Sequence, residues 1–303
     1  MIAMKEEKSD ITTAKVIDRS LLMTQPPSLG WVLVKSLLKS GSYQVGDRLP
    51  SVEAYRENLL INRKHLKAYN QLCGFDGHKI PSTYLWVLCF PLVIKILLSK
   101  QFPLRAMGQI HLRNRISHYE PVDLHSPLNF QASVGSSDLT SRGLEWNIDL
   151  LATAGERAIW SSRSTFLYRC QTPIERKVAN EPEPLLEPLH SWPVNKKVGR
   201  QYATLSGDYN PIHLYALSAK MFGFKRAIAH GMWSKARCLA ELDRFIPEAG
   251  YTVDVAFRRP VFLPSKVCLS SHDSQDARKF SLTNTSGSQI HLDGTIYKEF
   301  ANA

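Results

Sequence analysis

The chain has 303 residues, of which 44% are hydrophobic and 21% charged, and its formal net charge is +11. This length allows one large or two medium domains with an ample core, and the composition excludes disordered and fibrous proteins. Lysines and arginines are spread along the chain without a concentrated basic block, which argues against a nucleic-acid-binding protein.

The cysteine and histidine spacings indicate neither a disulfide framework nor a metal site. The cysteines form no Cys-x-x-Cys pair, which is typical of buried thiols in a reducing compartment. The ten histidines show no His-x-x-x-His or Glu-x-x-His spacing, so we expect no bound metal. The five cysteines are Cys73, Cys89, Cys170, Cys238 and Cys268.

The chain starts with a polar lead that extends to about Ser28. Residues Met1–Ser20 carry mixed charges and no apolar core, so they are not a signal peptide, and the last residues form no recognisable address. We therefore expect a cytoplasmic protein. Beyond the lead, Trp31–Leu38 predicts a strand or short helix, and Val45–Asp47 predicts a turn.

The most apolar run of the chain is Tyr84–Leu98. It contains Pro91 and Lys95 and is too short to cross a bilayer. We predict a buried helix here and no membrane span.

The sequence repeats itself with a nearly constant offset. Tyr69–Phe75 matches Tyr202–Asp208 at a tyrosine, a leucine, a small residue and a glycine, 133 residues apart. Ala154–Arg169 matches Ser286–Lys298 at an offset of 132, and each is a glycine turn followed by an alternating strand pattern. The chain therefore predicts two diverged copies of one unit.

The segments between these anchors also correspond. Leu85–Leu98 matches the helical pattern after His230, and Gly108–Pro121 matches Gly250–Pro264. Residues 172–197 are rich in proline and charge, which predicts a stiff extended linker. We accordingly divide the chain into a first unit (1–171), a linker (172–197) and a second unit (198–303).

The second unit predicts one helix followed by four strands. Apolar residues recur at helical spacing from Met232 to Ile246, and Pro247 closes the pattern. One helix followed by several strands indicates an α+β unit. The predicted strands are Tyr251–Arg258, Lys266–His272, Arg278–Thr283 and Gln289–Tyr297.

The segment richest in chemical groups lies just before this helix. Asp208 is ionised at neutral pH in an ordinary setting, and His213 can exchange a proton in the physiological range. Gly207 permits a sharp turn before the aspartate, and Asn210–Pro211 marks the end of that turn. Both side chains are therefore expected to face one small volume.

A second signal follows at His230–Gly231, where the helical pattern begins. A helix N-terminus carries unpaired N–H groups and the positive end of the helix dipole. Gly231 would let a carbonyl oxygen approach those donors. A carboxylate, an imidazole and a backbone donor form a minimal set for proton chemistry beside a carbonyl.

These residues carry a resemblance to a known family. The run SGDYNPIH (Ser206–His213), the later IAHGM (Ile228–Met232) and Phe257–Val261 resemble the MaoC-like dehydratases, also called (R)-specific or type-2 enoyl-CoA hydratases. The resemblance is most specific between residues 199 and 265. It implies a hot-dog fold, an antiparallel sheet wrapped around one long helix, and two such units imply a tandem (double) hot dog of the α+β class.

The resemblance also implies roles for residues of the second unit. Asp208 and His213 would act on a catalytic water, and Gly231 would supply an N–H to the developing oxyanion. Asn210 is predicted to orient water or substrate, and Arg259 is a cation that meets either a phosphate or solvent. Taken alone, Asp208 would suit a turn and His213 a core or cap, and His230 is interpreted as a structural residue at the helix start.

The predicted function is reversible hydration of trans-2-enoyl-CoA to (R)-3-hydroxyacyl-CoA, with coenzyme A as part of the substrate and no separate cofactor. A 3-hydroxyacyl-acyl-carrier-protein dehydratase also suits the basic charge, because acyl carrier protein is acidic. A non-catalytic acyl-thioester-binding protein and a thioesterase are the remaining alternatives. The acyl chain length, the physiological direction, the base among Asp208 and His213, and homodimer formation stay open.

The first unit lacks this chemistry. It has Phe75 where the second has Asp208, and no Asn-Pro-x-His segment follows. Asp76 and His78 are interpreted as solvated loop residues. We therefore expect a degenerate first unit with a supporting role, which leaves room for a long or bulky acyl tail.

Overall fold

The computed structural model describes residues 22–23, 32, 35–36, 38–77, 79–175, 188–274 and 277–298. The polar lead before residue 22, His78 and residues 176–187 of the predicted linker lie outside these residues. The strands of the described chain are β1 (Glu53–Leu59), β2 (Ile110–His118), β3 (Leu128–Thr140), β4 (Gly143–Ala154), β5 (Arg157–Tyr168), β6 (Pro188–Val194), β7 (Tyr251–Phe257), β8 (Ser265–Ser274), β9 (Ala277–Asn284) and β10 (Ile290–Tyr297). The helices are α2 (Arg63–Cys73), α3 (Ser82–Leu98), α4 (Val198–Ser206), α5 (Ala216–Lys220) and α6 (Gly231–Glu241), with 3₁₀ turns η2 (Pro211–His213) and η3 (Asp243–Phe245).

The strands of the described chain form one continuous antiparallel sheet in the order β1-β3-β4-β5-β2-β7-β10-β9-β8-β6. The order is symmetric about its centre, because the first five strands and the last five follow the same sequence of connections. The two halves join where β2 pairs with β7, from Arg113 opposite Ala256 to His118 opposite Tyr251. Each half is one copy of the predicted unit, and the tandem hot-dog fold is confirmed.

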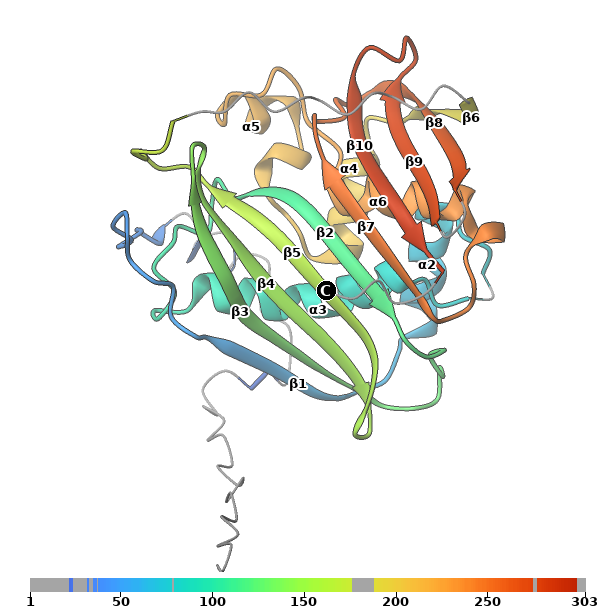
Figure 1. Cartoon of the computed structure of the whole chain (residues 1–303), viewed down its shortest axis with the longest axis horizontal. Coiled ribbons are helices and arrows are strands. Elements are labelled where there is room, and N and C mark those ends of the chain that lie inside the picture. Colours follow the sequence, from blue (N-terminus) through green and yellow to red (C-terminus); the bar gives the residue numbers. More distant parts are fainter. Residues whose placement is uncertain are drawn as a thin grey trace, which may run out of the picture.

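Each half of the sheet curves around a helix, α3 in the first and α6 in the second (Figure 1). The α3 helix is apolar on almost every side, as expected of a helix enclosed by a sheet, and it continues through Pro91. No helix in the described part of the chain is long and apolar enough to span a membrane.

One part of the predicted linker is a strand. Residues Pro188–Val194 form β6, which pairs with β8 at the edge of the sheet, so the interpretation of 172–197 as an extended linker is wrong over this stretch. Proline removes a donor from the hydrogen-bond ladder and is tolerated mainly on edge strands. Pro188 and Pro193 therefore suit this position, but prolines are rare in strands and so the sequence indicated a linker here.

The matching Tyr-x-x-Leu-x-Gly segments of the two copies form equivalent structures. Helix α2 ends at Gly74 and helix α4 at Gly207, and both glycines adopt the left-handed conformation with φ of 83° and 76°. Such a glycine is a common helix stop because it lacks a Cβ atom. The same turn therefore delivers Phe75 in the first copy and Asp208 in the second.

A buried lysine lies at the seam between the two halves. The Lys235 ammonium, on α6, donates to the Asn114 carbonyl at 3.0 Å, the Asn114 side-chain oxygen at 2.7 Å and the Val253 carbonyl at 3.2 Å. Burial lowers the pKa of Lys235 to about 7, and Asp254 opposes this effect. The contacts attach α6 to both central strands.

Candidate active site

The turn after α4 presents Asp208. Its carboxylate accepts a hydrogen bond from the Asn210 amide at 3.2 Å, and the Asn210 side chain caps η2 by accepting from the Ile212 amide at 3.4 Å. Pro211 occupies the first position of η2, where its missing N–H costs nothing. Asn210 therefore shapes the turn through its oxygen, and its predicted contact with water or substrate stays a prediction.

A close backbone approach brings His213 to the same place. A Cβ atom at Gly199 on α4 would lie 2.0 Å from the His213 carbonyl oxygen, so only glycine fits there. His213 Nδ1 lies 2.8 Å from the Ile228 carbonyl oxygen. Because a carbonyl can only accept, Nδ1 carries the proton, and Nε2 of the neutral ring is left as an acceptor.

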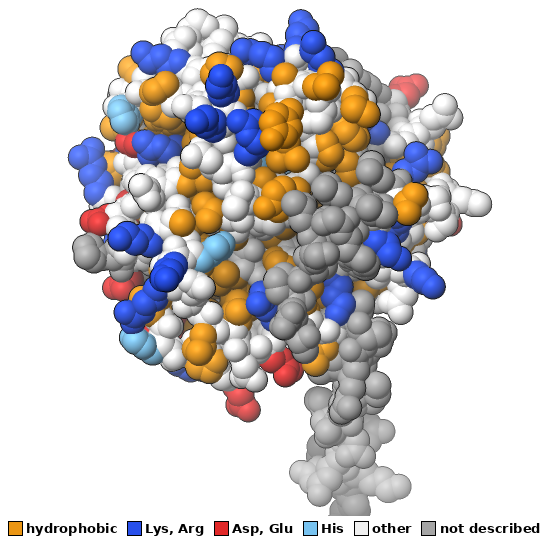
Figure 2. Space-filling view, turned by 180° about the vertical axis from the view of Figure 1, so that it is seen from behind, with side chains coloured by type: hydrophobic (Ala, Val, Ile, Leu, Met, Phe, Trp, Pro, Cys, Tyr) orange, Lys and Arg blue, Asp and Glu red, His pale blue; other side chains and the backbone are white. Residues whose placement is uncertain are grey.

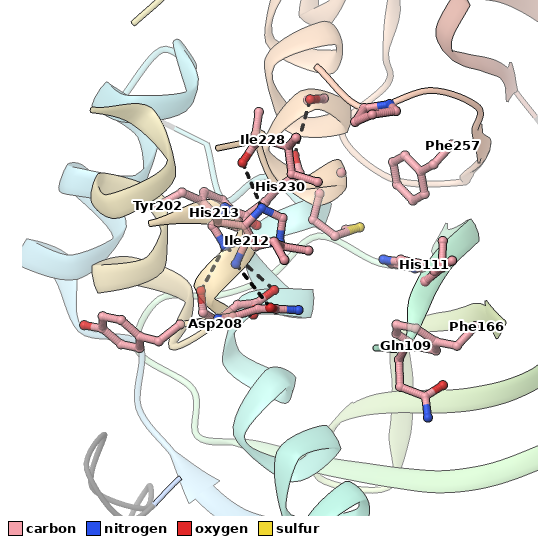
Figure 3. Close-up of a pocket in the computed structure, with 18 of the residues that line it drawn as sticks. Gln109, His111, Phe166, Tyr202, Asp208, Ile212, His213, Ile228, His230 and Phe257 are labelled. Atoms are coloured by element: carbon pink, nitrogen blue, oxygen red, sulfur yellow. Dashed lines mark hydrogen bonds and ion pairs between the residues drawn. The ribbon is translucent and has the colours of Figure 1, made fainter. Parts of the chain in front are cut away.

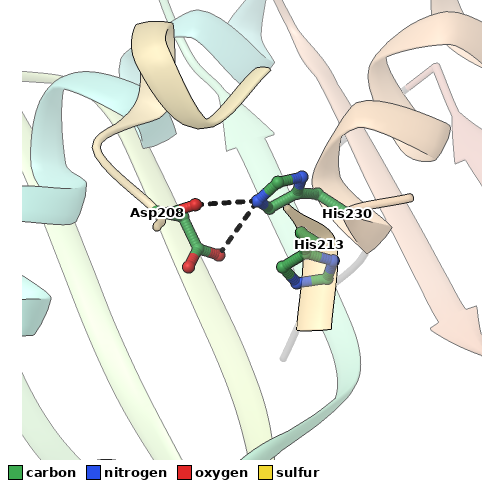
Figure 4. Close-up of side chains that lie close together, drawn as sticks. All are labelled: Asp208, His213 and His230. Carbon is green, nitrogen blue, oxygen red and sulfur yellow. Dashed lines mark hydrogen bonds and ion pairs between the residues drawn. The ribbon is translucent and has the colours of Figure 1, made fainter. Parts of the chain in front are cut away.

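His230 completes the cluster, although the sequence assigned it only to the start of a helix. It is the N-cap residue of α6, but its side chain makes no capping hydrogen bond. Instead Nε2 donates to the Asp208 carbonyl at 2.9 Å and lies 3.8 Å from the carboxylate (Figure 4). The His213 and His230 rings stack with their centroids 3.7 Å apart. The side chain of His230 therefore belongs to the site.

Burial controls the charges of this cluster. It raises the pKa of Asp208, although His213 and the Asn210 amide oppose the effect. Burial lowers the pKa of His213, opposed by Asp208, and lowers the pKa of His230 well below its usual range. Both imidazoles are therefore neutral at physiological pH.

The cluster lies at one end of a cavity of about 270 Å³. Figure 3 shows His111 and Phe166 on the wall that faces Asp208 and His213. An apolar stripe of α3 also lines the cavity, formed by Trp86, Phe90, Val93, Ile94 and Leu97. The second copy thus supplies the Asp208–His213–His230 cluster, and both copies supply the apolar lining.

Gly231, Arg258 and Arg259 line the same cavity, and their predicted roles stay predictions. Gly231 is the first residue of α6, so its N–H has no partner within the helix. A Cβ atom there would lie 3.0 Å from the Phe257 ring, so the packing also favours glycine. Arg258 and Arg259 line the cavity, and Arg258 is held by an ion pair with Asp293.

His111 was not identified from the sequence. It lies on β2, and its ring stacks on Phe166 at 4.5 Å and contacts Phe257 at 4.9 Å. Burial lowers its pKa to about 3, so the ring is neutral. A single histidine in an alternating strand carries no local signal, since its position in the cavity depends on pairing between distant strands.

The donor atoms of Asp208, His213 and His230 lie within 4.8 Å of one another, which is close enough to hold a metal ion. However, His213 Nδ1 and His230 Nε2 both lie within hydrogen-bond distance of backbone carbonyl oxygens. Only the remaining ring nitrogens and the carboxylate would be available to a cation. The expectation that the site works without a metal stays a prediction.

The fold and the site define a hot-dog dehydratase. Residues 171–294 match the family model described as "MaoC like domain". The 3-hydroxyacyl-thioester dehydratase X of Mycobacterium tuberculosis is 31% identical over 286 residues, which cover 90% of this chain and 99% of that protein. The chain belongs to the MaoC-like dehydratase family, as the motif predicted.

Solved structures agree with this assignment. The crystal structure of HtdX from Mycobacterium tuberculosis superposes with a TM-score of 0.71 at 28% identity, over 82% of this chain and 99% of that one. A MaoC-like dehydratase from Phytophthora capsici superposes with a TM-score of 0.65 at 19% identity, over 86% of this chain and all of that one. The second likeness supports the fold alone.

Proposed function

We propose that the chain catalyses the reversible hydration of trans-2-enoyl-CoA to (R)-3-hydroxyacyl-CoA. The observation that carries the proposal is the convergence of Asp208 and His213 at one end of an apolar cavity, beside the N-terminus of α6. The relative named as a 3-hydroxyacyl-thioester dehydratase supports an acyl thioester as substrate. The (R) outcome is what the family resemblance implies.

The reaction needs one water molecule held by two acceptors. The Asp208 carboxylate and His213 Nε2 each accept one hydrogen bond from this water, which leaves an oxygen lone pair free to attack C3 of the enoyl group. As the new C–O bond forms, the water gives one proton to the pair, and the pair delivers a proton to C2 on the same face. Dehydration reverses these steps through the same groups.

Charge grows on the thioester oxygen during the attack. We assign its stabilisation to the Gly231 N–H, which has the positive end of the α6 dipole behind it. His230 acts as a positioning residue, because its hydrogen bond to the Asp208 carbonyl fixes the turn that carries the carboxylate.

The charge distribution suits coenzyme A, whose phosphates are anionic. Arg258 and Arg259 line the cavity, and Lys and Arg side chains are far more frequent than Asp and Glu on the face shown in Figure 2. A basic surface raises the local concentration of an anionic ligand. It also suits an acidic acyl carrier protein, so the carrier-protein thioester is the second candidate substrate.

The decisive experiment follows the loss of enoyl absorbance over a panel of trans-2-enoyl-CoA chain lengths. We expect hydration by the wild type, and we expect Asp208→Asn to reduce kcat by roughly 10²- to 10⁴-fold with little change in substrate binding. Ser288 is exposed and does not line the cavity, so Ser288→Ala is the control and should retain full activity.

Other outcomes would reject the proposal. Full activity of Asp208→Asn would exclude the assigned role of the carboxylate. Release of free thiol from a saturated acyl-CoA would indicate a thioesterase, and binding without any turnover would indicate a non-catalytic module. Matched CoA and carrier-protein thioesters, compared by kcat/KM, decide between the two substrate forms.

A further inference from the structure

The structure contains a second cavity, of about 300 Å³, at the opposite end of the two central helices. It lies between the N-terminus of α3 and the C-terminal end of α6, whereas the catalytic cavity lies between the N-terminus of α6 and the C-terminal end of α3. The two cavities are therefore related by the internal symmetry of the chain.

The correspondence extends to individual lining residues. Helix positions of the two copies are offset by 149 residues, which relates Ser82 at the start of α3 to Gly231 at the start of α6. At this offset three of the five α3 residues in the catalytic cavity have counterparts in the second cavity. These pairs are Phe90 with Leu239, Ile94 with Asp243 and Leu97 with Ile246.

Among the described residues, the groups needed for hydration have no counterparts in the second cavity. Phe75 replaces Asp208, and Pro81 replaces His230 at the residue before the helix. The insertion that carries His213 has no counterpart in the first copy. The described part of the chain therefore does not repeat the hydration site, yet a cavity of similar size is retained.

The second cavity has a different buried polar group, the imidazole of His118. His118–Val122 and Phe257–Val261 both end in Pro-Val and line their respective cavities, so His118, at the end of β2, corresponds to Phe257 of the catalytic copy. Only 3% of the His118 surface is exposed. Its Nδ1 lies 3.3 Å from the Tyr251 hydroxyl, and its Nε2 is buried without a hydrogen-bond partner. A buried polar atom without a partner costs free energy, which a ligand in the cavity can recover.

The neighbours of His118 define what this nitrogen can do. Burial lowers the pKa of His118 to about 4, opposed by the Glu120 backbone, so the ring is neutral. The Glu120 backbone carbonyl can only accept, and Nε2 has no hydrogen-bond partner, so the ring proton lies on Nδ1. Nε2 of the neutral ring is therefore left as an acceptor.

The mouth of this cavity disfavours anions. Asp123, Asp243 and Glu248 line it, and its lysine, Lys79, is paired with Asp243 at 3.3 Å. His125, which also lines the cavity, forms a hydrogen bond with Arg63. The catalytic cavity carries two arginines instead, so a polyanionic thioester is attracted to one cavity and repelled from the other.

We propose that the second cavity is a ligand-binding site for a small uncharged amide with a short apolar tail. The ligand's N–H donates to His118 Nε2 beside the N-terminus of α3, and its tail packs between Leu239, Ile246 and Val122. The site is independent of the proposed hydration and would persist if that proposal failed.

The test uses hexanamide and hexanoate, which match in shape and differ in charge. Methyl-labelled full-length protein is titrated with each probe and followed by NMR. We expect hexanamide to shift the methyl signals of Leu239 and Ile246, and hexanoate to bind about tenfold more weakly. The methyl signals of Ile94 and Leu97 report separately on binding in the catalytic cavity.

Three variants make the test specific. His118→Phe should weaken hexanamide binding about tenfold, whereas His118→Gln, which keeps a side-chain acceptor, should retain it. Asp208→Asn should abolish hydration without changing binding at Leu239 and Ile246. The proposal is overturned if hexanamide leaves these signals unmoved, if hexanoate binds as well, or if folded His118→Phe binds like the wild type.

Discussion

At the scale of single residues, the site depends on hydrogen bonds to the backbone. The Ile228 carbonyl fixes the tautomer of His213, and the Asp208 carbonyl occupies His230. These hydrogen bonds hold each imidazole in one orientation, and burial keeps both rings neutral. A neutral ring with a free Nε2 can accept a proton from water, and a protonated ring cannot.

The first prediction concerns pH. Activity requires unprotonated His213, and burial lowers its folded pKa below the ordinary 6.5. The acid limb of kcat/KM for the free enzyme should therefore have its midpoint below pH 6.5, with activity lost only as pH falls through it. Stopped-flow or steady-state rates across the pH range measure this limb. A midpoint at or above pH 6.5 would contradict the lowered pKa of His213 on which this prediction rests.

The second prediction concerns His230. In His230→Ala the Asp208 carbonyl loses its donor and the stacked His213 ring loses its neighbour. We expect kcat to fall roughly 10- to 100-fold because the carboxylate is misplaced, with a smaller change in KM. His230→Gln, which keeps a donor, should recover part of the rate. Equal losses in both variants would argue against a positioning role.

At the scale of elements, helix α4 and turn η2 must touch closely to bring the reactive groups together. Gly199 is the point of contact, since a Cβ atom there would lie 2.0 Å from the His213 carbonyl oxygen. The glycine at the end of α4 sets the direction of the chain, and Gly199 sets its distance from His213. Both glycines act by the backbone geometry that they permit, and neither contributes a reactive group.

The third prediction follows from this contact. Gly199→Ala should displace η2 and lower kcat by roughly tenfold or more, and the clash should destabilise the fold by about 1–3 kcal/mol. Gly77→Ala, at an exposed position with open space around it and no left-handed backbone, is the control for a general glycine effect. Thermal unfolding of both variants measures the loss of stability, and enoyl-CoA kinetics measure the loss of kcat.

At the scale of the whole molecule, two copies share one sheet and one active site. The seam between β2 and β7 carries the buried Lys235, which is bonded to atoms of both central strands. The catalytic cavity draws its reactive groups from the second copy and its apolar lining from both copies. Neither copy alone encloses this cavity.

The fourth prediction concerns the stability of that seam. The folded pKa of Lys235 is about 7, below its ordinary 10.5, so the unfolded chain binds more protons between these values. The contribution of Lys235 to the free energy of unfolding should therefore rise with pH across this window. Chemical denaturation of wild type and Lys235→Met measures it as their difference. If the difference in unfolding free energy between the two proteins did not change with pH, the lowered pKa of Lys235 would be contradicted.

The sequence by itself determined the features that a short segment encodes. The turn at Gly207, the pair Asp208 and His213, the helix start at Gly231 and the four strands after it follow from local spacing and backbone preference. The internal repeat predicted the double fold, because similar sequences form similar units. These predictions needed no knowledge of distant contacts.

Only the tertiary structure decided which distant residues meet. It placed the side chain of His230 against Asp208, brought His111 and Phe166 from the first copy to the catalytic cavity, and made β6 a strand. It also revealed the second cavity around His118. These features depend on strand pairing and side-chain packing between segments far apart in the chain, so no local pattern records them.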